Sequence, residues 1–212
     1  MSSSKVAVID YGMGNVWSVM SAFKYLGAEV DLVSDPEVLE KSEILVLPGV
    51  GSFRKGAEAL RNRGIDEAIG NAVASGNSKI LGICLGMQLM GSYGTEDGGA
   101  EGLGLLSNRV ERFTPEELGG MKIPHVGFNE IRYQEQSGLF EGLTENPDFY
   151  FVHSYRMLLD NFDGPYALCR YGSDFLAAFE TGNIYGTQFH PEKSQTNGLI
   201  LLRNFMRSKI SC

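Results

Sequence analysis

The stretch that decides the fold is residues 79–88, which read KILGICLGMQ. Its first five residues are a short apolar run typical of a buried strand, and a helix is expected to follow. At the junction, Cys84 stands two residues from a glycine on either side. This G-x-C-x-G pattern is typical of a sharp strand-to-helix turn that exposes a nucleophile. The flanking positions must be small because neighbouring backbone approaches such a turn closely.

Cys84 is therefore the candidate nucleophile. The helix that follows would point its amino end toward the sulfur, and the partial positive charge there favours thiolate over thiol. Free cysteines are often only small buried apolar residues. Cys169 and Cys212 have no comparable setting and keep that interpretation. Three scattered cysteines predict neither a disulfide framework nor a zinc site.

Strands and helices alternate on the amino-terminal side of this turn. Strands are expected at residues 6–9, 30–33 and 44–47. Helices are expected at residues 15–26, from Pro36 onward, and at residues 53–74 with a break near Gly64. This order predicts an α/β three-layer sandwich, in which helices cover both faces of a central, mostly parallel sheet.

The pattern changes after residue 100, where strand-like stretches follow one another closely. They lie at residues 109–113, 130–133, 149–152, 167–171, 176–180 and 184–189. We expect antiparallel or mixed additions to the same sheet, followed by a closing helix over residues 199–206. No linker or repeat interrupts the chain, so residues 1–212 are expected to form one domain.

Charge and composition exclude several classes of function. The net charge of −8 and the pI near 4.9 argue against nucleic-acid binding, which needs a concentrated basic surface. The first apolar run is too short for a signal peptide or a membrane span. The chain is therefore expected in the cytoplasm, with no membrane or nucleic-acid partner.

A cysteine nucleophile needs a base, which a third group usually orients. His190 follows a strand-like run, and Pro191 favours an extended backbone there, so Glu192 is expected on the same face as His190. Glu192 could then hold the imidazole in one tautomer. His153 ends an aromatic strand and is expected to line the pocket. His125 follows a proline and is interpreted as a residue that caps a turn.

These motifs together resemble the class I (triad) glutamine amidotransferases, over nearly the whole chain. Within that family they are most similar to the glutaminase subunits of imidazole glycerol phosphate synthases, enzymes of histidine biosynthesis. Besides residues 82–86 and 190–192, the match includes residues 10–15 (DYGMGN), 48–53 (PGVGSF), 122–129 (KIPHVGFN), 151–155 (FVHSY) and 188–194 (QFHPEKS).

The resemblance implies that Cys84, His190 and Glu192 hydrolyse L-glutamine through a glutamyl thioester. The oxyanion would be stabilised by the backbone N–H groups of Leu85 and Val50. In this family the loop that contains the second donor is thought to rotate a peptide when the partner triggers it. Binding of the amino-acid end of glutamine is implied for Gln88, Glu96, His153, Ser154 and Tyr155, with Asp97 as the alternative to Glu96.

The resemblance also implies a partner, a (β/α)8 barrel cyclase that receives ammonia and forms a heterodimer with this chain. Asn15, Tyr150 and Lys193 match positions at that interface. No cofactor and no metal are expected. Phe128 stands where many histidine-pathway members have tryptophan, and similar subunits supply ammonia for sugar amination in surface-polysaccharide biosynthesis. That role and a free-standing cysteine hydrolase are the alternatives, and the identity of the partner stays open.

Overall fold

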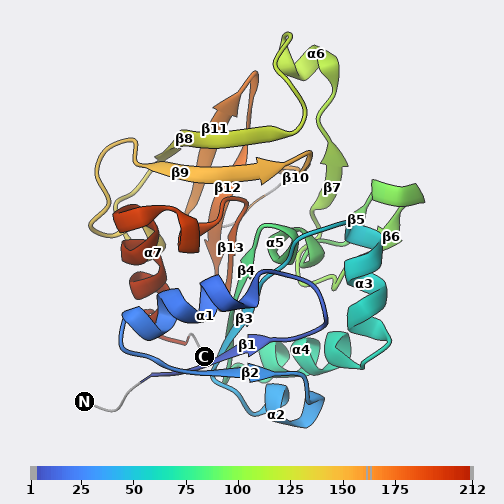
Figure 1. Ribbon diagram of the computed structural model, residues 1–212, viewed down its shortest axis with the longest axis vertical. Coiled ribbons are helices and arrows are strands. Elements are labelled where there is room, and N and C mark those ends of the chain that lie inside the picture. The colour runs from blue at the N-terminus through green and yellow to red at the C-terminus, as the bar shows by residue number, and fades with distance from the viewer. Residues whose placement is uncertain (1–3, 161, 163, 211–212) are drawn as a thin grey trace.

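A large sheet forms the centre of the computed structural model, which describes residues 4–160, 162 and 164–210. Its strand order is β2-β1-β3-β4-β13-β12-β11-β8-β9 (Figure 1). The first five strands in this order run parallel, and the other four add antiparallel. The strands are β1 Lys5–Ile9, β2 Glu29–Val33, β3 Ile44–Leu47, β4 Lys79–Ile83, β8 His125–Tyr133, β9 Asp148–His153, β11 Tyr166–Tyr171, β12 Ser173–Thr181 and β13 Ile184–Thr187.

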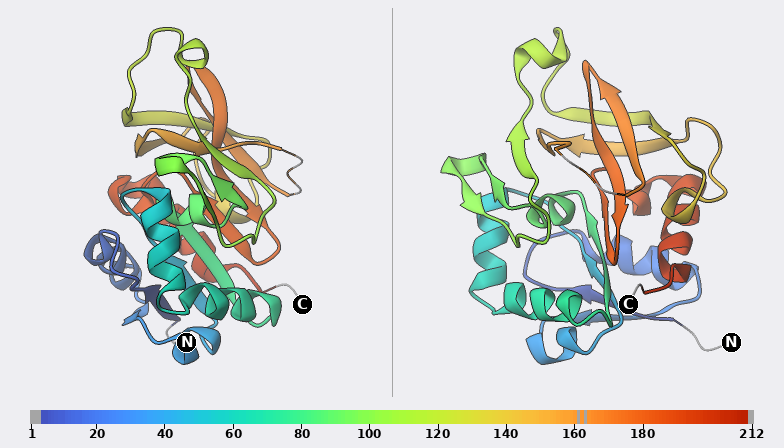
Figure 2. Two further views of the ribbon diagram at one scale, coloured as in Figure 1. Left: turned by 90° about the vertical axis from the view of Figure 1, so that its right-hand side faces the viewer. Right: turned by 180° about the vertical axis from the view of Figure 1, so that it is seen from behind.

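Helices cover both faces of the parallel strands. α1 and α7 lie on one face, and α3 and α4 lie on the other (Figures 1 and 2). The α-helices are α1 Val16–Tyr25, α2 Pro36–Glu40, α3 Phe53–Arg61, α4 Ile65–Ala74, α5 Leu85–Leu89, α6 Pro115–Leu118 and α7 Gln195–Arg207. Short 3-10 turns occur at Glu96–Gly98, Gly138–Phe140 and Pro191–Lys193.

The side chains of β1 show why its sequence is a continuous apolar run. Val6 and Val8 belong to the core beneath α1 and α7. Ala7 and Ile9 belong to the core beneath α3 and α4. Because successive side chains of a strand point to opposite faces, a strand covered on both faces must be apolar throughout. The predicted three-layer α/β sandwich is confirmed.

The helix boundaries follow local signals in the sequence. The Asp35 carboxylate accepts a hydrogen bond from the backbone N–H of Glu37 at the start of α2, as an N-cap does. Gly64 adopts a left-handed φ of 65° and separates α3 from α4, so the predicted break is confirmed. Glycine suits this position because it has no side chain to clash in that conformation.

One predicted strand joins a different sheet. Residues 109–112 form β7, which belongs to a second sheet of order β10-β7-β5-β6 and does not extend the main one. The other strands of this small sheet are β5 Tyr93–Gly94, β6 Ala100–Glu101 and β10 Tyr155–Met157. The prediction was wrong because alternation of apolar residues indicates an extended chain but not the strand it pairs with.

The central position of β4 determines where function can lie. It pairs with β3 on one side and β13 on the other, all parallel, so their carboxyl ends meet at one edge. Ligands of open α/β sheets bind outside that edge. Within the described part of the chain, no helix is long and apolar enough to cross a membrane.

Candidate active site

The turn after β4 holds Cys84 in a strained backbone conformation, with φ 55° and ψ −109°. Two close approaches explain the glycines on either side. A Cβ at Gly86 would overlap the carbonyl oxygen of Leu47, and one at Gly82 would lie 2.6 Å from the backbone nitrogen of Met87. The predicted reason for these glycines is confirmed, because the backbone leaves no room for a side chain.

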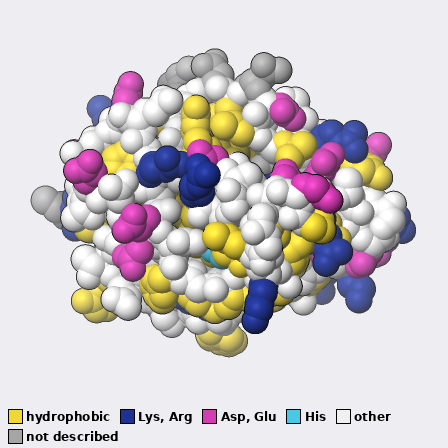
Figure 3. Space-filling model, turned by 90° about the horizontal axis from the view of Figure 1, so that it is seen from above, with side chains coloured by type: hydrophobic (Ala, Val, Ile, Leu, Met, Phe, Trp, Pro, Cys, Tyr) yellow, Lys and Arg dark blue, Asp and Glu magenta, His cyan; other side chains and the backbone are white. Residues whose placement is uncertain are grey.

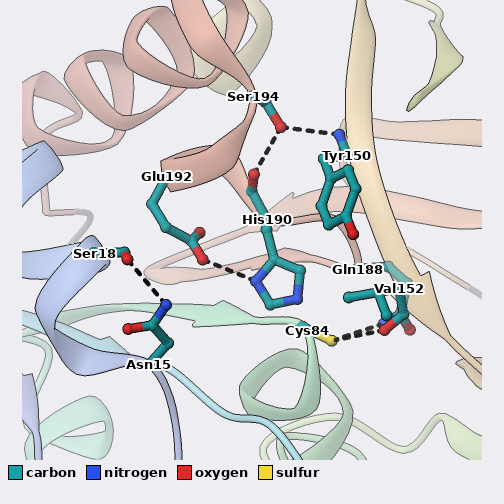
Figure 4. Close-up of polar contacts among 9 residues, drawn as sticks. All are labelled: Asn15, Ser18, Cys84, Tyr150, Val152, Gln188, His190, Glu192 and Ser194. Carbon is teal, nitrogen blue, oxygen red and sulfur yellow. Dashed lines mark hydrogen bonds and ion pairs between the residues drawn. The ribbon is translucent and has the colours of Figure 1, made fainter. Parts of the chain in front are cut away.

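His190 and Glu192 lie just beyond the end of β13. Nδ1 of His190 and Oε1 of Glu192 are 2.9 Å apart, and both side chains are buried (Figure 4). The predicted contact is confirmed, but its geometric reason was wrong. Residues 191–193 form a 3-10 turn rather than an extended segment, and this turn brings the carboxylate back to the imidazole.

The neighbouring strand β9 braces the backbone of His190. The N–H of His190 donates to the carbonyl oxygen of Tyr150 at 2.9 Å. The Ser194 hydroxyl donates to the carbonyl oxygen of His190 at 2.7 Å and accepts from the N–H of Tyr150 at 3.0 Å (Figure 4). These three bonds tie the backbone of His190 to β9.

The charge of His190 depends on its two neighbours. Burial disfavours the imidazolium, but interactions with Cys84 and Glu192 outweigh that effect and raise the pKa of His190 to about 10. The imidazole nitrogen Nε2 is buried and has no hydrogen-bond partner among the described residues. It lies on the side of the ring that faces Cys84 (Figure 4). Nε2 is therefore the nitrogen placed to exchange a proton with a reacting group.

A cavity of about 330 Å³ opens above Cys84. It brings together nine of the residues predicted for catalysis, oxyanion stabilisation or substrate binding. These are Val50, Cys84, Leu85, Gln88, Glu96, His153, Ser154, Tyr155 and His190. Figure 3 shows an imidazole at the floor of a hollow bordered by hydrophobic side chains. Glu192 is not part of the lining and contacts the site through His190.

Gln88 and Gln188 form a polar bridge beneath this cavity. Nε2 of Gln88 donates to Oε1 of Gln188 at 3.0 Å, and Nε2 of Gln188 lies 3.7 Å from Sγ of Cys84. Sequence reasoning assigned no role to Gln188. Its position two residues before His190 was the available signal, but the partner Gln88 is one hundred residues away along the chain.

Glu96 is another residue of the cavity, and its carboxylate also caps the start of a helix. Oε2 of Glu96 accepts from the N–H of Phe53 at 2.7 Å, at the start of α3. Burial raises the pKa of Glu96, the bond from Phe53 opposes that effect, and the charge of Asp97 adds to it. Glu96 lines the cavity, whereas Asp97 is absent from its lining.

The loop at residues 48–51 packs directly on the nucleophile turn. A Cβ at Gly49 would lie 2.6 Å from the Tyr11 hydroxyl and 2.8 Å from Cβ of Leu85. The Tyr11 hydroxyl donates to the carbonyl oxygen of Pro48 at 2.9 Å, a tether that sequence reasoning missed. Val50 and Leu85 both line the cavity, so the N–H groups of the loop and of the turn are candidates to stabilise an oxyanion.

Sequence comparisons agree with this geometry. The family described as glutamine amidotransferase class-I matches residues 7–208. The chain belongs to the class-I glutamine amidotransferase family. It is 45% identical over 203 residues to "Imidazole glycerol phosphate synthase subunit HisH 1" from Campylobacter jejuni subsp. jejuni serotype O:23/36 (strain 81-176), covering 95% of this chain and 99% of that one. It is 39% identical to "Imidazole glycerol phosphate synthase subunit HisH" from Acinetobacter baylyi, covering 98% and 100%.

Solved structures of amidotransferases share the fold. A "glutamine amidotransferase" crystal structure has a TM-score of 0.73 at 24% identity, covering 95% of this chain and 96% of that one. A second glutamine amidotransferase, from Thermotoga maritima, has a TM-score of 0.65 at 15% identity, covering 98% and 100%. At these identities the likeness concerns the fold alone.

Two of the three residues predicted for the partner interface of this amidotransferase lie together. The ammonium of Lys193 sits 5.7 Å from the ring centroid of Tyr150, and the ring of Phe128 lies 5.5 Å from that centroid on the neighbouring strand. Asn15 precedes α1 and donates from its amide to the Ser18 hydroxyl at 2.9 Å (Figure 4).

Two remaining sequence interpretations have different outcomes. Cys169 is fully buried in the apolar core, as expected, and Cys212 lies outside the described residues. The interpretation of His125 as a turn cap was wrong. β8 begins five residues earlier than predicted, so His125 is a buried residue of this strand. It faces His153 on the adjacent strand β9.

Proposed function

We propose that this chain is the glutaminase subunit of an imidazole glycerol phosphate synthase. In that role it hydrolyses L-glutamine to glutamate and ammonia and serves histidine biosynthesis. The observation that carries the proposal is a Cys84–His190–Glu192 arrangement at one pocket, in a chain similar over nearly its whole length to two subunits of that name.

In the proposed reaction, Sγ of Cys84 attacks the side-chain amide carbon of glutamine. The C–N bond breaks as Nε2–H of His190 gives its proton to the departing nitrogen, and ammonia leaves a glutamyl thioester. Water then adds to the thioester carbon while His190 takes its proton, and the C–S bond breaks to release glutamate. Glu192 keeps Nδ1 engaged and stabilises the imidazolium.

Each tetrahedral intermediate carries a negative oxygen that needs fixed N–H donors. We assign one donor to Leu85, which follows the nucleophile at the start of α5, and one to Val50 in the adjoining loop. Gln88, Glu96 and the segment from His153 to Tyr155 are assigned to the amino-acid end of glutamine. All of them border the same cavity.

A surface beside the cavity supports a protein partner, which we assign to a (β/α)8 barrel cyclase. Val126 and Phe128 of β8 are 56% and 47% exposed, and Val152 of β9 pairs with Val126 and is 37% exposed. Val152 also lines the cavity, and its carbonyl oxygen lies 4.0 Å from Sγ of Cys84. Contiguous exposed apolar residues mark interaction sites. A partner seated here would cover the cavity and could receive ammonia directly.

The deciding experiment compares the chain alone with the chain plus the cyclase of an imidazole glycerol phosphate synthase. We expect little glutamine hydrolysis by the chain alone and strong stimulation by the cyclase with its ligand bound. Cys84→Ala should abolish glutamine-dependent synthesis and leave synthesis from added ammonium salt intact, because the cyclase needs only ammonia. Full hydrolysis by the isolated chain would instead indicate a free-standing cysteine hydrolase.

Phe128 is the specific reason to test two candidate partners, a histidine-pathway cyclase and a synthase of sugar amination. Co-purification from the native cell, followed by identification of the bound protein, decides between them. Recovery of a sugar-modifying synthase in place of a histidine-pathway cyclase would assign the chain to sugar amination and contradict the proposed pathway, while the assignment of Cys84, His190 and Glu192 would stand.

A further inference from the structure

Two buried imidazoles outside the proposed catalytic triad face each other from adjacent strands of the sheet. His125 of β8 and His153 of β9 are direct partners in the strand register, and Nδ1 of His125 lies 3.1 Å from Nε2 of His153. Their exposed fractions are 1% and 6%. The rings of Tyr171 and Phe151 stack on His125 at centroid distances of 4.0 and 4.8 Å.

The hydrogen bonds at the two ends give this pair a single direction. Nδ1 of His153 lies 2.9 Å from the carbonyl oxygen of Tyr155, which can only accept, so Nδ1 carries the proton. Nε2 of His153 must then accept, and Nδ1 of His125 must donate. Nε2 of His125 in turn accepts from the side-chain amide of Asn129 at 3.0 Å. Every donor in this His125–His153 chain points toward Tyr155.

This direction requires both rings to be neutral, and their surroundings favour that state. Burial lowers the pKa of His125 to about 4. Burial also lowers the pKa of His153 to about 3, although the bond to the Tyr155 carbonyl opposes the effect. The positive charges of His190 and Arg156, and that of His125 whenever it is protonated, disfavour protonation of His153 further. Each ring therefore has one donor and one acceptor nitrogen at neutral pH.

The His125–His153 hydrogen-bond chain ends at the wall of the cavity. The Tyr155 carbonyl oxygen accepts a second bond, from Nε2 of Gln88 at 2.9 Å. The other hydrogen of this amide points to Oε1 of Gln188 at 3.0 Å. With both N–H groups of Gln88 engaged by the protein, its carbonyl oxygen is the polar atom left to face a ligand. An amide oxygen suits the ammonium group of an amino acid.

We propose that His125 is a positioning residue of the glutamine pocket, which acts through His153 to hold the Tyr155 carbonyl and thereby fix the orientation of the Gln88 amide. The inference rests on the proposed function and adds a residue that touches neither glutamine nor Cys84. Without the donor on His125, the His153 ring is free to change tautomer or rotate. The Tyr155 carbonyl then loses a partner, and the Gln88 amide loses its fixed orientation.

The kinetic test uses the complex with the cyclase, in which glutamine-dependent synthesis is measured. His125→Phe keeps a ring between Tyr171 and Phe151 and removes the hydrogen bonds. His125→Phe should raise KM for glutamine about tenfold, with kcat within about threefold of the wild type. A tenfold change corresponds to about 1.4 kcal/mol, which is typical of one lost buried hydrogen bond. His125→Asn places an amide donor near the Nδ1 position and should recover most of the loss.

Tyr171→Leu is the packing control, because it removes a ring that stacks on His125 and leaves the hydrogen-bond chain intact. Its KM should stay within about threefold of the wild type. An unchanged KM in His125→Phe would overturn the inference, as would an equal rise in Tyr171→Leu. A wild-type complex without glutaminase activity would contradict the proposed function instead.

Nitrogen-15 NMR of the histidine rings tests the direction of the His125–His153 hydrogen bonds without any activity assay. Both His125 and His153 should be neutral Nδ1–H tautomers at pH 7, assigned by single substitution of each residue. In His125→Phe, the His153 signals should lose this single-tautomer signature. A wild-type Nε2–H tautomer at either residue, or an imidazolium at pH 7, would overturn the inference.

Discussion

At the scale of single residues, the proposed catalysis depends on an imidazole held between a sulfur and a carboxylate. Glu192 lies outside the cavity lining, so any effect on glutamine passes through His190. Cys84, with its strained φ, and His190, with its unpartnered buried Nε2, both line the same cavity. Such strain persists only where the surrounding structure enforces it.

Glu192→Gln should separate catalysis from binding. The substitution removes a charge that raises the pKa of His190, so the imidazolium that donates to ammonia becomes less stable. We expect kcat for glutamine hydrolysis to fall about 100-fold, with KM within about threefold. Steady-state kinetics of the complex measures both, and Glu145→Gln at an exposed position is the control. A kcat within about threefold of the wild type would contradict the role of Glu192.

Two glycine substitutions should change stability in opposite directions. Gly86→Ala forces a methyl group onto the Leu47 carbonyl and should lower the free energy of unfolding by about 1–3 kcal/mol. Gly70→Ala lies within α4 with open space around it and should raise that free energy by about 0.4–1 kcal/mol. Urea denaturation measures both. Equal stability of the two variants would mean that the nucleophile turn tolerates a side chain.

At the scale of elements, β4 and α7 are joined at the edge of the sheet opposite the active site. The buried Lys79 starts β4, and its ammonium donates to the carbonyl oxygens of Phe205 at 2.8 Å and Met206 at 3.0 Å. It also donates to the Ser208 carbonyl beyond the helix. These bonds satisfy carbonyls that the last turn of a helix leaves unpaired.

Lys79→Met should therefore loosen α7. It keeps most of the apolar stem and removes the donors, so the unfolding free energy should fall by about 1.5–3 kcal/mol, as for hydrogen bonds to charged groups. Lys5→Met is the matched control, because Lys5 makes one exposed ion pair with Asp31 and should change stability by less than about 1 kcal/mol. Thermal unfolding compares the two variants, and equal losses would count against the Lys79 contacts.

Element boundaries followed local chemistry, whereas pairing did not. The Asp35 cap and the left-handed Gly64 were readable from neighbouring residues, and α2 and the α3–α4 break were predicted correctly. The partner of β7 was not readable, because Val110 pairs with Met157, far along the chain. The 3-10 turn after His190 was also missed, since Pro191 suits the first position of such a turn as well as an extended segment.

At the scale of the whole molecule, buried neutral histidines connect stability to pH. In an unfolded chain each imidazole titrates near pH 6.5, whereas burial lowers the pKa of His125 to about 4 and of His153 to about 3. Below pH 6.5 the unfolded state binds more protons than the folded state. The stability from this effect is present above pH 6.5 and is lost as the pH falls toward 4.

Acidification from pH 7 to pH 4.5 should therefore lower the urea midpoint of the wild type. Each histidine contributes up to about 1.4 kcal/mol per pH unit below 6.5. His125→Phe removes one titrating group and should show a shallower dependence over this range. Urea unfolding at several pH values measures the slopes. A slope as steep in the variant as in the wild type would show that His125 does not contribute.

Much of this protein was determined by its sequence alone. The G-x-C-x-G turn, the apolar strands and the proximity of His190 to Glu192 depend on residues near one another in the chain, so the sequence predicted them, although the 3-10 turn that joins His190 to Glu192 was missed. The tertiary structure decided the second sheet, the bridge from Gln88 to Gln188 and the link from His125 to His153. Those contacts join residues far apart along the chain, and only the packing of the sheet brings them within hydrogen-bond distance.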